Sequence, residues 1–209
     1  MWHGVPDLHG MPNLIERRHE QTRTAIADAA VALFIEHGFV ETTMDDVAHA
    51  AGVSRRTAYR HFPSKDDLVF EQPRRWLQHF NVTIADRRPG ETPRQRCRRG
   101  LIAVAELIQV NAASVLPAYS VFVATPSLRG GNGRIQDDWF QRYLELLTPP
   151  RRVSPTRALQ IATVAGALVG TTTMLVALWA ASQPVANIVT MTTNVLDQLD
   201  PVWPEWLDN

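Results

Sequence analysis

Residues 54–65, SRRTAYRHFPSK, carry most of the side chains whose types and spacing could do chemistry. No acidic residue lies between Val47 and Lys65. Arginine can form paired hydrogen bonds with guanine O6 and N7, and threonine can contact a thymine methyl group. Tyrosine, histidine and lysine can reach phosphate oxygens. This segment therefore has the composition of a short helix that reads the major groove of DNA.

Other chemistries find little support. The lone Cys97 excludes an internal disulfide and a cysteine-rich zinc site, and the 7 histidines show no metal-ligand spacing. We therefore expect no catalytic residues, no metal and no cofactor, and we do not expect an enzyme. Cys97 lies among arginines that could stabilise its thiolate, which keeps a redox-responsive protein open as an alternative.

Length, hydrophobic content and net charge limit the kind of protein that carries these residues. The chain has 209 residues, 45% of them hydrophobic, with 21 Lys and Arg against 21 Asp and Glu. This is typical of a folded protein of one large or two small domains, not of a disordered one. Because the net charge is zero, binding to nucleic acid must come from a local patch.

The elements that would position the cationic segment are helices. Residues 23–37 place apolar side chains at i, i+3, i+4, i+7 and i+8, the spacing of an amphipathic helix. Thr43 can cap a second helix, Gly52 can make a turn, and Ser54 can cap a third helix that ends near Phe62. Strand-like alternation is hard to find, so the sequence predicts an all-α protein of about nine helices. The fourth is expected to run from about Lys65 into the 80s with a kink at Pro73. Residues 127–133 are expected to form a glycine-rich loop before a helix that starts near Ile135.

One family resemblance is specific. Residues 22–69 resemble the N-terminal domain of the tetracycline-repressor (TetR) family, a helix-turn-helix domain of three helices. The landmarks are AxxLFxxxGF in the first helix, TTMDDVAxxAGVS, the Tyr59-x-x-Phe62 pair and Ser64-Lys65. The resemblance implies a cytoplasmic, homodimeric regulator of transcription, usually a repressor that a small effector releases from a palindromic operator in double-stranded DNA. An activator remains an alternative.

The resemblance also implies roles for single residues. Base-edge positions fall on Arg55, Arg56 and Thr57, and Arg60 is solvated, on a phosphate or on a base. Phosphate contacts fall on Thr43, Tyr59 and Lys65, and also on His61. The expected DNA-binding residues are Thr43, Ser54, Arg55, Arg56, Thr57, Tyr59, Arg60, His61 and Lys65.

The resemblance further implies three parts for the whole chain. We expect a flexible arm over residues 1–18, the DNA-binding domain over 19–70, and a helical effector-binding and dimerisation domain over 71–209. A mainly apolar effector would lie among the middle helices. The candidate pocket walls are Leu116, Tyr119, Phe122, Trp139, Tyr143, Met174 and Trp179.

The family resemblance also implies that the last two helices form the dimer, and the sequence fits this. No charged side chain occurs from Ala158 to Leu196, and small residues in this run allow close helix packing. The expected interface residues are Gly166, Val169, Gly170 and Leu178. Residues 161–181 are also long and apolar enough to span a bilayer, which leaves a membrane-anchored regulator as a remote alternative. We favour a helix buried in a soluble dimer and expect no membrane partner.

A cluster of arginines opens the second domain. Arg94, Arg96, Arg98 and Arg99 crowd the start of one predicted helix. They are expected to form a solvated basic face, with the phosphates of an acyl-coenzyme A as the less favoured ligand.

Overall fold

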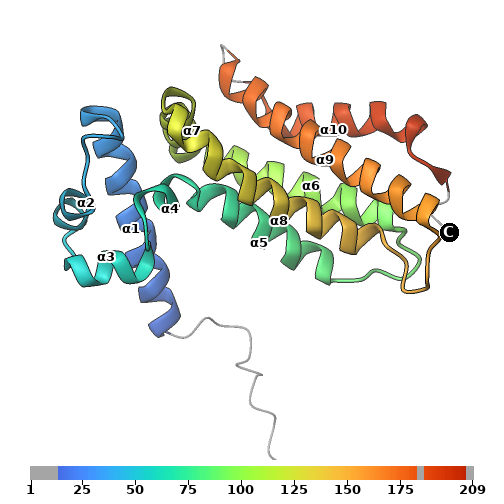
Figure 1. Ribbon diagram of the computed structural model, residues 1–209, viewed down its shortest axis with the longest axis horizontal. Helices are drawn as coiled ribbons and strands as arrows, with labels where there is room; N and C mark the ends of the chain where they lie inside the picture. The colour runs from blue at the N-terminus through green and yellow to red at the C-terminus, as the bar shows by residue number, and fades with distance from the viewer. Residues whose placement is uncertain (1–13, 183–185, 206–209) are drawn as a thin grey trace, which may run out of the picture. The chain divides into compact units, whose positions relative to one another are not determined.

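The computed structural model describes residues 14–182 and 186–205, and the regular elements in this part of the chain are ten α-helices and two short 3-10 helices. The all-α prediction is therefore confirmed. The chain divides into two compact units, residues 1–68 and 69–209. Figure 1 shows the helices of each unit.

The first unit contains three helices in the expected order: α1 (Leu14–His37), α2 (Met44–Ala50) and α3 (Arg55–His61). Its core takes Ile26, Ala30 and Phe34 from α1 and Val47 from α2, all nearly inaccessible to solvent. These α1 residues are spaced by four, so they form one stripe along the helix.

Helix α1 is longer than the sequence predicted. It begins at Leu14, so residues 14–18, which were expected in a flexible arm, are helical. Residues 1–13 lie outside the described part of the chain. The part of α1 before residue 23 contacts α3. The ring of His19 packs against that of His61, with ring centres 4.2 Å apart.

The expected fourth helix is two helices, α4 (Lys65–Val69) and α5 (Glu71–Ala85), with a break at Phe70. The sequence predicted one helix kinked at Pro73. A proline inside a helix removes one backbone hydrogen bond and crowds the preceding turn, whereas in the first turn no bond is lost. Restarting the helix at Glu71 places Pro73 in the first turn of α5, which explains the break.

The second unit is a bundle of long helices. It adds to α5 the helices α6 (Pro93–Val110), α7 (Ala112–Ala124), α8 (Arg129–Leu147), α9 (Pro155–Ala181) and α10 (Ile188–Leu199). Thr92 and Ser154 cap α6 and α9, each followed by proline at the first helical position. The axis bends by 94° between α6 and α7. Figure 1 shows α9 and α10 side by side.

Helix α8 also begins earlier than expected. The glycine-rich run of residues 127–133 was expected to be a loop, with the helix starting near Ile135, but the helix starts at Arg129. The glycine at position 131 permits a close approach, because a Cβ atom there would lie 2.6 Å from Cε2 of Phe70. Glycine weakens a helix by only about 1 kcal/mol, which packing can offset.

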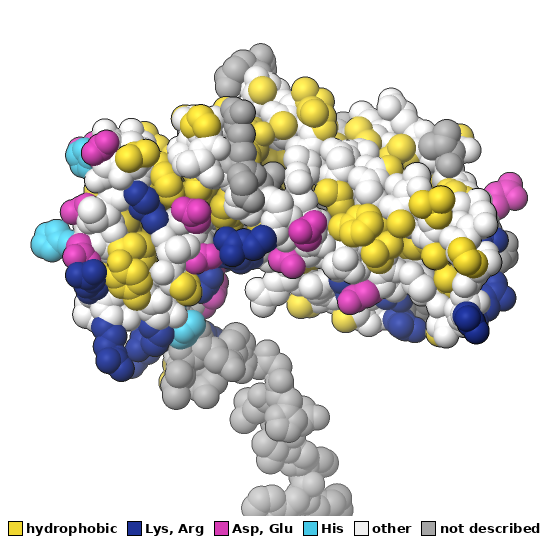
Figure 2. Space-filling view, viewed as in Figure 1, with side chains coloured by type: hydrophobic (Ala, Val, Ile, Leu, Met, Phe, Trp, Pro, Cys, Tyr) yellow, Lys and Arg dark blue, Asp and Glu magenta, His cyan; other side chains and the backbone are white. Residues whose placement is uncertain are grey.

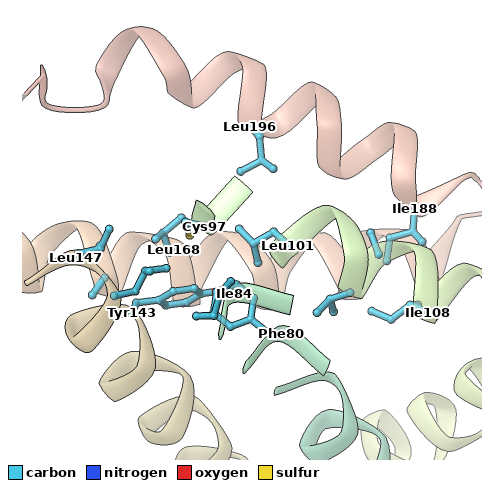
Figure 3. Packing of buried hydrophobic residues seen from close by; sticks show 14 of the residues in the cluster. Phe80, Ile84, Cys97, Leu101, Ile108, Tyr143, Leu147, Leu168, Ile188 and Leu196 are labelled. Carbon is cyan, nitrogen blue, oxygen red and sulfur yellow. The ribbon is translucent and has the colours of Figure 1, made fainter. Parts of the chain in front are cut away.

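The core of the second unit lies between α5, α6, α8 and α9. Figure 3 shows Phe80 and Ile84 of α5 directed towards Tyr143 of α8. The Phe80 and Tyr143 rings meet edge to face, with centres 5.7 Å apart. Gly100 brings α6 close to α5 here, since a Cβ atom at Gly100 would lie 2.5 Å from Phe80 Cε2. The core is therefore tightly packed at this crossing.

Helix α9 is less buried than the sequence suggested. Ile161, Ala165 and Leu168 face the core, whereas Leu159 and Leu178 are 69% and 58% exposed. Within one copy of the chain this helix is not buried on nearly all sides. It is the one described helix that by itself is long and apolar enough to cross a membrane, a test that core helices also pass.

Candidate nucleic-acid interface and effector cavity

A tight turn connects α2 to α3 and packs the two helices together. Gly52 has a φ of 66°, a conformation that glycine adopts without the penalty of a side chain. The amide of Val53 donates a hydrogen bond to the carbonyl oxygen of Ala48 at 2.9 Å, which closes the turn. Ala48 and Ala58 are almost fully buried, and their small side chains let the two helices approach. The predicted helix-turn-helix is confirmed as a local structure.

Both helices of the motif are capped as predicted. The Thr43 hydroxyl accepts from the amide of Asp46 at 3.2 Å, and the Asp46 carboxylate accepts from the Thr43 amide at 2.8 Å. The Thr43 hydroxyl also donates to the Asp46 carboxylate at 2.6 Å. This hydrogen bond, followed by the one from the Thr43 amide, lowers the pKa of Asp46 below its usual value. Ser54 caps α3 by accepting from the amide of Thr57 at 3.2 Å. The caps fix the first turn of each helix.

One face of α3 is exposed and cationic. Arg55, Arg56 and Arg60 are exposed, and Tyr59 is 39% exposed. Figure 2 shows Lys and Arg side chains gathered at the end of the first unit where Figure 1 places α3. Arg56 and Arg60 form no ion pair within the described residues. This face is therefore free to meet a polyanion.

Arg55 is oriented by two neighbours. Its Nε atom lies 3.0 Å from Oδ1 of Asp45, and its guanidinium lies 5.5 Å from the centre of the Tyr59 ring. An ion pair between exposed groups contributes only about 0–1 kcal/mol. The guanidinium can therefore leave Asp45 for a stronger partner such as a guanine edge.

His61 points into the first unit and not towards solvent. Its side chain is 5% exposed, and its backbone oxygen accepts a hydrogen bond from Nη1 of Arg23 at 2.8 Å. Burial, followed by the nearby charges of His19, Arg60 and Arg23, lowers the pKa of His61 below its usual value. The expectation of a phosphate contact from this residue is at odds with its position. His61 is a packing residue of α3.

Lys65 is bonded to its own unit. Its ammonium donates to the backbone oxygens of Phe39, Val40 and Thr42, at 2.5, 3.1 and 2.9 Å. An ammonium group has three N–H donors, so these bonds use all of them. Lys65 thereby ties α4 to the connection between α1 and α2, an arrangement that differs from the phosphate contact expected from the sequence.

The second unit contains a cavity of about 160 Å³. Its walls are mostly apolar and aromatic and come from α5 to α10, with Val69 at the end of α4. The aromatic walls include Phe70, Trp76, Tyr119, Phe122 and Trp139. A cavity of this kind is the usual form of a small-molecule site.

The prediction from the sequence identified part of this cavity wall. Three of the seven candidate residues line the cavity, namely Tyr119, Phe122 and Trp139. The other four do not: Leu116 packs on the core, Tyr143 and Trp179 are fully buried in the core, and Met174 is 57% exposed. Phe70 and Trp76 were missed, because nothing in the sequence signals that α5 forms part of the wall.

Three of the four arginines at the start of α6, all except Arg96, are engaged in ion pairs. Arg99 makes a bidentate ion pair with Glu91. Its Nε lies 2.6 Å from one carboxylate oxygen, and its Nη2 lies 2.8 Å from the other. Arg98 donates to Asp197 at 2.5 Å, and Arg94 lies 4.0 Å from Asp200. These pairs correct the expectation of a solvated basic face, and they occupy groups that could otherwise hold coenzyme phosphates.

Cys97 does not fit the redox alternative. Its side chain is 1% exposed, and burial raises the pKa of its thiol to about 12. Oxidation and exchange require an accessible thiolate. The idea that neighbouring arginines stabilise a thiolate is therefore wrong for this fold, where the thiol packs in the core.

The expected dimer residues lie on two sides of α9. Gly166, Gly170 and Leu178 are exposed, and the space beside Gly170 is open. Val169 instead lines the cavity.

These features place the chain among helix-turn-helix proteins with a second, all-helical domain. Residues 26–71 match the family described as "Bacterial regulatory proteins, tetR family". The chain is 44% identical over 55 residues to the HTH-type transcriptional repressor KstR2 of Rhodococcus jostii, covering 26% of this chain and 27% of KstR2. It is 29% identical over 123 residues to the HTH-type transcriptional regulator TcmR of Streptomyces glaucescens, covering 56% and 54%. The chain spans about a quarter to a half of these relatives.

The similarity of this chain to known structures also covers the second unit. SmeT of Stenotrophomonas maltophilia, solved in complex with triclosan, superposes with a TM-score of 0.62 at 20% identity, over 87% of this chain and 91% of SmeT. Residues 26–71 therefore match the DNA-binding domain of the tetR family of bacterial regulatory proteins, and most of the chain shares its fold with SmeT. Together these comparisons support a regulator of the tetR family.

Proposed function

We propose that this chain is a cytoplasmic, homodimeric regulator that represses transcription by occupying a palindromic operator and is released by a small, mainly apolar effector. The observation that carries the proposal is the exposed cationic face of α3, held by a capped turn. A capped helix with three free or weakly paired arginines suits the major groove, where arginine reads guanine.

The dimer part of the proposal rests on α9. Leu159, Met174 and Leu178 are each more than half exposed on this apolar helix. A contiguous exposed apolar face usually marks a surface that another chain covers. A second copy packed on α9 and α10 would cover it and would supply the second recognition helix that a palindrome requires.

The effector part rests on the cavity and on its connection to the first unit. Val69 is the last residue of α4 and Phe70 follows it, and both line the cavity. Lys65, at the start of α4, bonds to the α1–α2 connection. A ligand that displaces these wall residues would act on α4. SmeT, whose fold is similar, is described as the repressor of a multidrug efflux pump and was solved with triclosan.

The ligand must bind the DNA-incompetent state more tightly, since equal affinity for both states shifts nothing. A coupling of about 1–3 kcal/mol would reduce operator affinity about 5–150-fold. Genome-wide mapping of bound sites would identify the operator, and footprinting should then show two half-sites on one DNA face. A single half-site would contradict the proposed dimer.

The release step has its own test. Compounds that bind the purified protein are titrated into the protein–operator complex, and operator affinity is measured by fluorescence anisotropy. We expect affinity to fall as the cavity fills. A tight ligand of the cavity that leaves operator affinity unchanged would contradict release, and one that raises it would favour the activator alternative.

A further inference from the structure

We infer that the cavity selects an electrically neutral, largely aromatic molecule and rejects anions. This inference rests on the proposed function, because it concerns the effector of the same cavity. It starts from the charge of the wall. Among the residues that the structure describes, no Lys, Arg, His, Asp or Glu side chain lines the cavity.

The polar groups in the wall are themselves neutral. They belong to glutamines on two helices, Gln72 and Gln136, to Tyr119, to the indoles of Trp76 and Trp139, and to several threonines. Burial raises the pKa of Tyr119 above its usual value, so its hydroxyl stays protonated near neutral pH. These groups can donate or accept hydrogen bonds, but they cannot neutralise a charge.

Two of the wall threonines have already used their donors. The hydroxyl of Thr172 donates to Leu168 O at 2.8 Å, and that of Thr192 donates to Ile188 O at 2.8 Å. With these protons engaged, each hydroxyl can offer a ligand only its acceptor oxygen. An anion would meet these oxygens unfavourably, whereas a hydroxyl or amide group of a neutral ligand could donate to them.

The aromatic side chains favour flat ligands. Phe70 and Phe122 meet edge to face with ring centres 6.1 Å apart, and Trp76 and Trp139 also line the cavity. Aromatic groups pack well against such rings in offset or edge-on arrangements.

Two arginines of α6 are not available to an anion in the cavity. Arg98 and Arg99 of α6 are held by Asp197 and Glu91, and neither arginine lines the cavity. A carboxylate, sulfonate or phosphate in the cavity would therefore lose its hydration without gaining a charged partner, which is costly. Neutral and anionic compounds of the same shape should bind with different affinities.

A matched pair of fluorescent probes tests this. N-phenyl-1-naphthylamine is neutral, and 1-anilinonaphthalene-8-sulfonate has the same ring skeleton with one sulfonate. Each is titrated into the full chain, and the dissociation constant is taken from the rise in probe emission. We expect the neutral probe to bind at least about tenfold more tightly, because only the sulfonate is buried unpaired.

A positive charge added to the wall should largely remove the preference for the neutral probe. Gln136→Lys places a cation at the cavity and should lower the ratio of the sulfonate to the neutral dissociation constant by about tenfold. Gln141→Lys adds the same charge at an exposed position of the same helix and should leave the ratio unchanged. Gln72→Lys on α5 repeats the test from another wall, and circular dichroism checks that each variant is helical.

The outcomes separate this inference from the proposed function. Equal binding of both probes, or a ratio that Gln136→Lys and Gln72→Lys do not move, would overturn the neutral selectivity and leave an effector site in place. Binding of neither probe would count against the cavity as an effector site and so against both proposals.

Discussion

The ammonium group of Lys65 lies 4.5 Å from the centre of the Phe39 ring and donates a hydrogen bond to the backbone oxygen of the same residue. Two further carbonyl oxygens, of Val40 and Thr42, accept its other protons. Lys65 thus fixes the position of α4 on the first unit. Because α4 leads directly into the cavity wall at Val69, this attachment bears on both stability and control.

We expect Lys65→Met to lower the free energy of unfolding of the protein by about 1.5–3 kcal/mol, since hydrogen bonds from a charged donor are lost. Urea unfolding followed by circular dichroism measures this. Arg60→Met removes an exposed cation without an ion pair in the described residues and should change stability by less than about 0.5 kcal/mol. A Lys65→Met protein of unchanged stability whose DNA binding has a salt slope reduced by about one would instead indicate a phosphate contact.

Arg55 and Arg56 should differ in how they contribute to base reading. Arg56→Ala should reduce discrimination between the operator and a mutated operator by about 1–3 kcal/mol, because a bidentate contact to guanine is lost. Arg55→Ala should also reduce discrimination, but by up to about 1 kcal/mol less. In the free protein Arg55 is paired with Asp45, and breaking that pair already costs part of the gain from the guanine contact. Competitive binding assays with single-base operator variants measure both. If neither change alters base preference, α3 is not the base-reading helix.

Local signals in the sequence were sufficient for the motif. The caps at Thr43 and Ser54 and the turn at Gly52 each depend on residues within four positions, and all three are present as predicted. The surroundings of His61 and Lys65 could not be predicted from the sequence, because their partners are distant in sequence. The ring of His61 meets His19, and Lys65 bonds to carbonyls 23 to 26 positions earlier.

The cavity shows the same limit. Trp139 and Tyr143 are one helical turn apart on α8, and the sequence predicted that both line the pocket. Trp139 does, but Tyr143 is fully buried against Phe80. Which of two neighbouring aromatic residues faces a cavity depends on how far α8 is rotated against α5, and helical periodicity alone does not define that angle.

The stability of the protein should fall as the solution is acidified through the range where histidine titrates. The folded pKa of His61 is below its ordinary value of 6.5, mainly because of burial. Below pH 6.5 the unfolded chain takes up a proton that the folded chain resists, so acid favours unfolding until the folded pKa is reached. His19, Arg23 and Arg60 also oppose protonation, and Glu20 weakly favours it.

His61→Phe keeps a ring beside His19 and removes the titration. Urea unfolding at pH 7.5 and at pH 5.5 should show a smaller loss of stability in this variant than in the unmodified protein. A wild-type protein that is equally or more stable at pH 5.5 would contradict the burial of a neutral His61.

Gly100 should tolerate no side chain. A Cβ atom there would lie 2.5 Å from Phe80 Cε2 and 2.7 Å from Ile84 Cγ2, and both of these side chains are fully buried. Gly100→Ala should therefore destabilise the protein by about 1–3 kcal/mol through overpacking. Gly133→Ala in α8 meets no atom within 4 Å and should be neutral or stabilising by up to about 1 kcal/mol. Thermal unfolding compares the two, and equal effects would mean that α5 and α6 can separate at low cost.

The dimer interface can be tested at Gly170. This residue is exposed on α9, no atom lies within 4 Å of a Cβ atom built on it, and Leu178, two turns along the helix, is 58% exposed. Within one copy Gly170→Arg therefore fits without a clash. In a dimer packed on α9 the two arginines would be brought together with little water, which is unfavourable.

Sedimentation velocity without detergent should show a dimer for the unmodified chain and monomer or aggregate for Gly170→Arg. Gln141→Arg on α8 adds the same charge at an exposed site and should remain dimeric. An unchanged dimer in Gly170→Arg would place the interface away from this part of α9, and a chain that sediments only as detergent-soluble aggregate would favour a membrane anchor.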